Sequence, residues 1–255
     1  MDLRQRRYFI PEIAGVLAVI CAWQAVSLVT NPLTVPGPVR SIHALIDNNF
    51  FWLDLLCSLA RALIASIIVT VLGLLTMRVF FYVPAIASAS NWTLGFWRSV
   101  PPVVLIPPVF LLVAEREYSA RILLAVVGSY PIFMANIVSG LKAIPPSRLE
   151  TVRLLSRGDN SAVFEHVVKK EIIPYVMVGF RITFAFCLII VVVSEMLWGT
   201  SGPGIGTRVR DASGISESPQ AWGIICLLGV AGVGVNLLLD WTESKLVFWT
   251  EREGS

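Results

Sequence analysis

The sequence predicts an all-α integral membrane protein, a single domain over residues 1–255 with six membrane-spanning helices. Of the 255 residues, 56% are hydrophobic and only 15% are charged, and the mean hydropathy is +0.75. These values lie above the range of soluble domains, and the apolar residues come in blocks. A third observation is a charged island between two of the blocks, at residues 145–173, which carries its own helix start and stop signals.

Six apolar stretches are candidates for the spans, because a helix needs about 20 mostly apolar residues to cross a hydrocarbon core of about 30 Å. They are residues 9–29, 56–77, 100–113, 122–141, 174–197 and 222–239. The third is the shortest and is rich in proline. The first is long enough to cross and no small-residue cleavage site follows it, so we expect it to be retained rather than removed as a signal peptide.

Basic residues predict the orientation of the spans, because Lys and Arg near span ends are retained on the cytoplasmic side. With the N-terminus inside, the opposite side of the membrane holds chiefly Arg40, Arg116, Arg208 and Arg210. Both termini and the island are therefore predicted to be cytoplasmic. This sidedness accounts for the net charge of +3 and gives no reason to expect a nucleic-acid partner.

The island is predicted to form a helix, a glycine turn and a second helix. Ser147 and Glu150 have the S-x-x-E spacing of a capping box, so the first helix should begin near Arg148, after two prolines. Gly158 suits the left-handed residue just past a helix, and residues 159–161 can cap the second helix.

The second helix of the island carries one apolar face, formed by Val163, Phe164, Val167 and Val168. Pro174 fits the first turn of the span that follows, where its missing N–H costs nothing. Local pattern alone supports two interpretations equally: a docking element for another protein, or an ordinary amphipathic loop.

Residue types that carry chemistry show no catalytic or metal-binding pattern. The sequence has no G-x-x-x-x-G-K-[ST] phosphate loop, and its four cysteines fall singly inside apolar blocks. Its two histidines, His43 and His166, are predicted to lie on opposite sides of the membrane. We therefore expect no catalytic residue, metal site or cofactor in this chain.

Several short motifs, in order and spacing, resemble those of the permease subunits of bacterial ATP-binding cassette (ABC) importers. In the island the matching positions are residues 150–152, Gly158 and Ile173-Pro174. Further matches lie at residues 35–38, 96–108, 130–140 and 195–206, so the resemblance covers most of residues 35–212. The resemblance is to the subfamily that imports nitrate, sulfonates, taurine, bicarbonate or thiamine-precursor pyrimidines. The resemblance implies the type I (MetI-like) permease architecture with a cytoplasmic coupling helix.

The island departs from the family pattern at several positions. Thr151 and Val152 stand where the family usually has two alanines, and Ser156 replaces its glycine, with Gly158 two residues late. Lys169-Lys170 replaces the first of two Leu-Pro steps. The resemblance thus implies that the island still docks on a partner protein, through contacts that differ in detail from those of the family.

In the resembled family the coupling helix sits in a groove of a separate ATPase subunit, which binds ATP and Mg. We expect Leu149, Val152, Leu154 and Phe164 to divide between that groove and the chain's own core, with rim charges beside them. The predicted coupling residues are Leu149, Glu150, Thr151, Val152, Arg153, Leu154, Arg157, Gly158 and Phe164. The other implied partners are a second permease copy or a non-identical permease, an external substrate-binding protein and the lipid of the bacterial inner membrane.

Charged residues inside the spans are costly in lipid and point to function or to internal pairing. Arg61 and Glu195 are predicted to lie at a similar depth, near the outer face, and are candidates for an ion pair. Arg181 is fourteen residues from Glu195, about 21 Å along one helix, so those two cannot pair within the chain. We favour a structural lock between spans over direct substrate contact for the Arg61–Glu195 pair.

The transport path is predicted to run beside a broken helix, because Pro101 and Pro102 interrupt helical hydrogen bonding at membrane depth. Arg98 is a candidate to attract an anion, or else an interfacial anchor. Asn136 and Ser139 either line the path or bridge helices. The predicted path residues are Arg98, Pro101, Pro102, Asn136, Ser139 and Glu195, and Arg208 and Arg210 in a glycine-rich outer loop are candidates to meet the binding protein.

Other function classes stay open at this point. A secondary transporter or channel would need no ATPase, but such proteins usually contain inverted repeats, and no convincing repeat is visible here. A membrane-embedded enzyme fits less well still, because no catalytic cluster is visible. The substrate is either a small anion of the sulfonate, taurine or nitrate kind, which the arginines favour, or a neutral thiamine-precursor pyrimidine.

Overall fold

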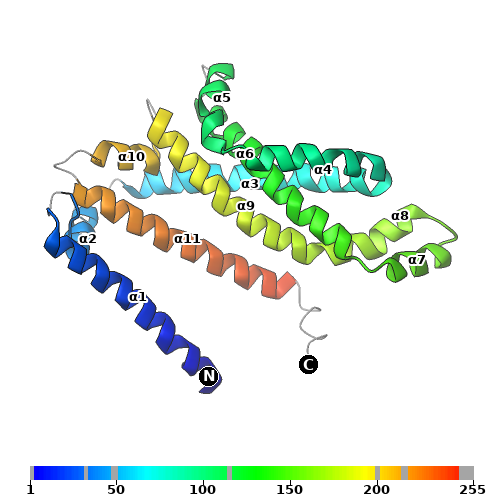
Figure 1. Cartoon of the computed structure of the whole chain (residues 1–255), viewed down its shortest axis with the longest axis horizontal. Helices are drawn as coiled ribbons and strands as arrows, with labels where there is room; N and C mark the ends of the chain where they lie inside the picture. The colour runs from blue at the N-terminus through cyan, green and yellow to red at the C-terminus, as the bar shows by residue number, and fades with distance from the viewer. Residues whose placement is uncertain are drawn as a thin grey trace.

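The computed structural model describes residues 3–31, 34–46, 51–113, 117–198, 202–213 and 218–246, and within these ranges every regular element is helical. The side chains of residues 3–13, 117, 243, 244 and 246 lie outside this description. Figure 1 shows an elongated bundle with α7 and α8 at one end of its long axis and α10 at the other.

Four of the described helices are long and apolar enough to cross a membrane, so the chain is an all-α integral membrane protein. They are α3 (Phe51–Tyr82), α6 (Glu117–Ala143), α11 (Ser218–Leu246), and the run Asn160–Trp198 that joins α8 (Asn160–Val163), a π-helical turn η2 (Phe164–Val168) and α9 (Lys169–Trp198). These contain the predicted spans at 56–77, 122–141, 222–239 and 174–197. The predicted first span falls in α1 (Leu3–Val29), whose described apolar part, Ala14–Val29, is shorter than a full span.

The third predicted span, at residues 100–113, is not one straight helix, in agreement with the broken helix that Pro101 and Pro102 predict. The chain instead forms α4 (Pro84–Ser99), a short 3₁₀ helix η1 (Pro102–Leu105) and α5 (Ile106–Leu112), and the two halves are bent by 89°. Steric contact with a following proline pushes a residue out of the helical region. Val100 before Pro101 has ψ 118° and Pro101 before Pro102 has ψ 125°, both extended, so the two prolines place the bend.

The core lies where α3, α6 and α9 pack together. Glycines allow these helices to approach closely, as small residues commonly do between membrane helices. A Cβ on Gly73 of α3 would lie 2.4 Å from the Phe133 ring of α6, and one on Gly140 of α6 would lie 2.5 Å from Ile172 of α9. α2 (Pro38–Ile46) packs across α11 in the same way, through Gly223.

Pro174 does not begin a helix, contrary to the sequence-based expectation. It lies inside α9, and the helix runs unbroken from Asn160 to Trp198. A proline in a helix removes one backbone hydrogen bond. Here Val168 and Ile172, before the proline, are buried in the core, and this packing holds the segment helical in spite of that loss. The island is therefore directly continuous with a membrane-spanning helix.

Candidate functional site

The first helix of the island, α7 (Pro146–Leu155), begins without the predicted capping box. Pro145 is the N-cap residue and no side chain caps the helix, while the Ser147 carbonyl accepts a hydrogen bond from the Thr151 hydroxyl at 2.8 Å. Pro146 takes the first helical position, where its fixed φ and missing N–H suit the geometry. The helix therefore starts two residues earlier than expected, and Glu150 is exposed.

The glycine turn after α7 has the predicted left-handed geometry. Gly158 has φ +88° and its N–H donates to the Arg153 carbonyl at 2.7 Å, and Arg157 also has a positive φ of 55°. The Asp159 carboxylate accepts from the Ser161 N–H at 2.8 Å and so caps α8, as predicted. The turn is thus fixed on both sides by hydrogen bonds.

The apolar side chains of the island divide between two directions. Leu149 and Val152 pack against the core, and Phe164 is buried there with Val163, Val167 and Val168. Leu154 and Leu155 point away from the core and are 81% and 80% exposed. Leu155 was not among the predicted coupling residues, although its place beside Leu154 at the end of the helix was a signal. We call Leu154 and Leu155 the leucine tip.

The leucine tip stands on a base formed by the rest of the island, which packs against the membrane helices. Phe164 packs against the rings of Phe81 and Tyr82, with centroid distances of 5.3 and 5.8 Å, at the junction of α3 and α4. Arg148 of α7 forms an ion pair with Glu171 of α9. The island therefore contacts both α3 and α9 directly.

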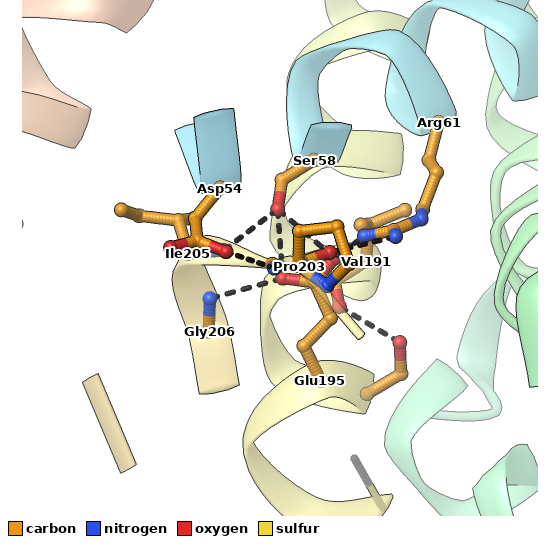
Figure 2. A network of polar contacts seen from close by, with 10 residues as sticks. Asp54, Ser58, Arg61, Val191, Glu195, Pro203, Ile205 and Gly206 are labelled. Atoms are coloured by element: carbon orange, nitrogen blue, oxygen red, sulfur yellow. Dashed lines mark hydrogen bonds and ion pairs between the residues drawn. The ribbon is translucent and has the colours of Figure 1, made fainter. Parts of the chain in front are cut away.

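At the opposite end of α9, Glu195 and Arg61 form an ion pair with 2.5 Å between the Arg61 Nη1 and Glu195 Oε1 atoms (Figure 2). Glu195 is fully buried and Arg61 is 3% exposed. The Glu195 carboxylate also accepts from the Ser58 hydroxyl at 2.8 and 2.9 Å and from the Gly206 N–H at 2.9 Å. A buried charge is costly unless it is paired and hydrogen-bonded, and the Glu195 carboxylate meets both conditions.

A second layer of bonds ties the segment before α10 (Ile205–Ala212) to α3. Asp54 accepts from the Gly204 N–H at 2.8 Å and from Nε of Arg208 at 2.6 Å. The Ile205 N–H donates to the Ser58 hydroxyl at 2.9 Å, and Arg61 donates to the Pro203 carbonyl at 2.7 Å. We call Asp54, Ser58, Arg61 and Glu195 the polar lock; it joins α3, α9 and α10 in one network.

Arg181, the third charged residue singled out within the spans, also has a partner. Arg181 of α9 forms an ion pair with Asp240 of α11. Within the part of the chain that the structure describes, no group of three or more His, Cys, Asp and Glu side chains is placed to hold a metal ion.

The structure separates the six predicted path residues. Arg98 and Ser139 line one cavity of about 210 Å³ between α4 and α6. Pro101 and Pro102 form the 89° bend next to it. Asn136 lies elsewhere: its Nδ2 donates to the Ile132 carbonyl at 3.0 Å, and its Cβ is 3.2 Å from where a Cβ on Gly179 of α9 would stand. Glu195 belongs to the polar lock.

Comparison with known proteins gives a consistent picture. The family model described as "Binding-protein-dependent transport system inner membrane component" matches residues 70–247. A probable ABC transporter permease protein of Brucella abortus (strain 2308) is 24% identical over 228 residues, covering 88% of this chain and 89% of that protein. A nitrate import permease protein of Synechocystis sp. is 24% identical over 229 residues, covering 84% and 80%. Among solved structures, the inward-facing MetNI methionine ABC transporter has a TM-score of 0.64 at 19% identity, covering 75% of this chain and 94% of that one.

Proposed function

Because the chain belongs to the family of binding-protein-dependent transport system inner membrane components, the permease subunits of ABC importers, we propose that it forms the transmembrane path for a small anion. We infer an assembly of two permease copies, two ATPase subunits that bind ATP and Mg, and an external substrate-binding protein. The inferred location is the bacterial inner membrane with both termini in the cytoplasm, as the distribution of Lys and Arg predicts.

The observation that carries this proposal is the leucine tip on a base that packs against α3 and α9. Two adjacent leucines that are about four-fifths exposed, on a short helix with polar neighbours, form the apolar anchor of a protein interface. The base continues into a single helix from Asn160 to Trp198, which ends at the polar lock. A partner that pulls on the leucine tip would therefore move α9 and α10 as one body.

The preference for an anion has two supports. One relative is named as a nitrate importer, and the cavity beside the proline bend is lined by Arg98 and Lys142 with no carboxylate among its lining residues. A sulfonate, taurine or nitrate fits this charge better than a neutral thiamine-precursor pyrimidine does.

Purification of the tagged chain in mild detergent is expected to recover an ATPase subunit, and the double substitution Leu154→Glu/Leu155→Glu is expected to reduce that recovery at least about tenfold. When the partner binds, the two introduced carboxylates would be buried in an apolar groove without a counter-charge. This is far more costly than leaving them exposed to water in the unbound chain. The measurement is the ratio of ATPase subunit to tagged chain by mass spectrometry, with the ATPase activity of the eluate as a second readout.

Ser161→Glu is the matched control, because it adds a negative charge to the same end of the molecule at an exposed position in the first turn of α8, where an acidic residue is favourable. It should copurify the ATPase like the wild type. Recovery of the ATPase by the double leucine variant would show that α7 is not the docking element. Elution of the chain alone even after crosslinking would favour a secondary transporter or channel.

Gly158→Val and Glu150→Arg are expected to uncouple ATP hydrolysis from transport while the protein remains in the membrane. A β-branched residue at φ +88° is strained by roughly 1–3 kcal/mol, so the turn that sets the angle between α7 and α8 would change. Glu150→Arg reverses an exposed charge beside the tip without touching the core. Transport and ATPase rates of the reconstituted complex measure the coupling ratio, and a normal ratio in both variants would contradict the assignment.

A further inference from the structure

The cavity between α4 and α6 is an elongated pocket with cationic groups toward both of its ends. Its lining extends along α4 from Asn91 to Arg98, about 10 Å, and along α6 from Pro131 to Lys142, about 16 Å, at 1.5 Å per residue. Arg98 lies in the last turn of α4, next to the bend, and Lys142 lies in the last turn of α6, next to the island. Ser139 lies one turn from Lys142.

The positive charge of this cavity is not compensated inside the described part of the chain. Neither Arg98 nor Lys142 forms an ion pair with a described residue, whereas the other charged pairs of the bundle, such as Arg61–Glu195 and Arg181–Asp240, are matched. None of the lining residues is acidic. Arg98 and Lys142 are both exposed, and two cations on one groove with no acidic residue among its lining attract an anion.

The hydrogen-bonding groups fit an oxyanion. A guanidinium offers paired N–H donors that match two oxygens of a planar or tetrahedral anion, the Lys142 ammonium adds a point charge, and the Asn91 amide and Ser139 hydroxyl supply neutral donors. We propose that Asn91, Arg98, Ser139 and Lys142 form an anion-binding station on the path from the proline bend toward the island, which takes a small singly charged oxyanion such as nitrate or a sulfonate group. This inference rests on the proposed function and specifies where its substrate binds.

A cysteine reporter in the cavity tests the station without any ATPase. Gly95 lines the cavity, and a Cβ built on it meets nothing within 4 Å, so Gly95→Cys fits without a clash. The reporter is placed in the full chain with Cys21, Cys57 and Cys226 replaced by alanine and the fully buried Cys187 retained. The chain is reconstituted in phosphatidylcholine nanodiscs, and the rate of modification by the uncharged reagent methyl methanethiosulfonate is measured with and without nitrate or ethanesulfonate.

Occupancy of a single site slows the reaction by the factor 1 + [L]/Kd, so about tenfold protection is expected when the anion is present at roughly nine times its Kd. Arg98→Gln and Lys142→Gln should each abolish most of the protection, which is measured as the ratio of the rates with and without the anion in the same variant, because loss of a nearby cation also changes the reactivity of the thiol itself. Arg78→Gln is the matched control, because it removes an exposed arginine that faces the rings of Tyr82 and Phe164 and does not line the cavity. It should keep full protection.

Three results would overturn the proposal: a reporter that does not react, protection that is absent with both anions, or protection that survives both charge removals. Protection that appears only when the nanodisc contains phosphatidylglycerol would identify a lipid headgroup site instead and would also overturn it. Because the readout is chemical protection in the isolated chain, failure here leaves the ATPase copurification result untouched, and loss of copurification leaves this test valid.

Discussion

Glu195→Ala is expected to destabilise the detergent-solubilised protein by about 3–5 kcal/mol and to abolish transport. Removal of one partner from a buried ion pair leaves the other charge uncompensated, and here the remaining charge is the guanidinium of Arg61, which is 3% exposed. The Gly206 N–H and the Ser58 hydroxyl lose an acceptor in the same step. The measurement is thermal stability, monitored by size-exclusion chromatography after heating to increasing temperatures, and a large loss is expected.

Asp211→Asn is the control for Glu195→Ala. Asp211 also belongs to an ion pair, with Arg210 on α10, but both side chains are exposed, and such pairs contribute only about 0–1 kcal/mol. Equal stability losses in the two variants would contradict a special role for the polar lock. Wild-type stability of Glu195→Ala would show that the lock does not hold the fold.

The exchange Arg61→Glu/Glu195→Arg is expected to rescue little of the loss from either single reversal. A simple pair would tolerate the swap, and restored function would indicate pairing alone. In the structure, however, position 195 receives the Gly206 N–H from the start of α10 and the Ser58 hydroxyl as well as the arginine. An arginine there would place donors against donors, so the swap also tests whether the backbone contacts matter.

Half of the polar lock was predictable from the sequence. Their positions within the predicted spans placed Arg61 and Glu195 at a similar depth in the membrane, and in the structure they form an ion pair. Asp54, Ser58 and Arg61 follow one another at intervals of four and three residues on α3, the spacing of one helix face, so that side of the lock was visible in principle. The donors from Gly204, Ile205 and Gly206 were not, because backbone N–H groups leave no residue-type signal.

The island shows the same division between local and tertiary control. The Gly158 turn and the Asp159 cap depend on the conformational preferences of single residues, and both were predicted correctly. The start of α7 and the place of Pro174 within a helix depend on which of two competing local and tertiary preferences is stronger. α7 begins at Pro146 and not at the predicted Ser147–Glu150 capping box. Core packing on both sides of Pro174 keeps α9 continuous. Tertiary contacts decided these boundaries, and sequence periodicity does not report them.

Gly206→Ala is expected to cost about 1–3 kcal/mol of stability and to lower transport sharply, although it adds only one methyl group. A Cβ at this position would lie 2.2 Å from the Val192 carbonyl oxygen and 2.8 Å from the Glu195 Cβ. The first of these is backbone of α9, which cannot move aside by changing a rotamer. α10 must therefore shift away from α9, and that shift lengthens the hydrogen bond from the Gly206 N–H to Glu195.

Gly229→Ala is the matched control for Gly206→Ala, because Gly229 also lies in a helix but a Cβ there meets nothing within 4 Å. It should be neutral or slightly stabilising, since alanine is favoured over glycine in helices by roughly 0.5–1 kcal/mol. If Gly206 acts through the polar lock, Gly206→Ala and Glu195→Ala should be strongly non-additive, because the second change removes the hydrogen bond that the first has already weakened. Additive losses would show that Gly206 serves packing alone, and that the link between α9 and α10 passes through Asp54 and Ser58 instead.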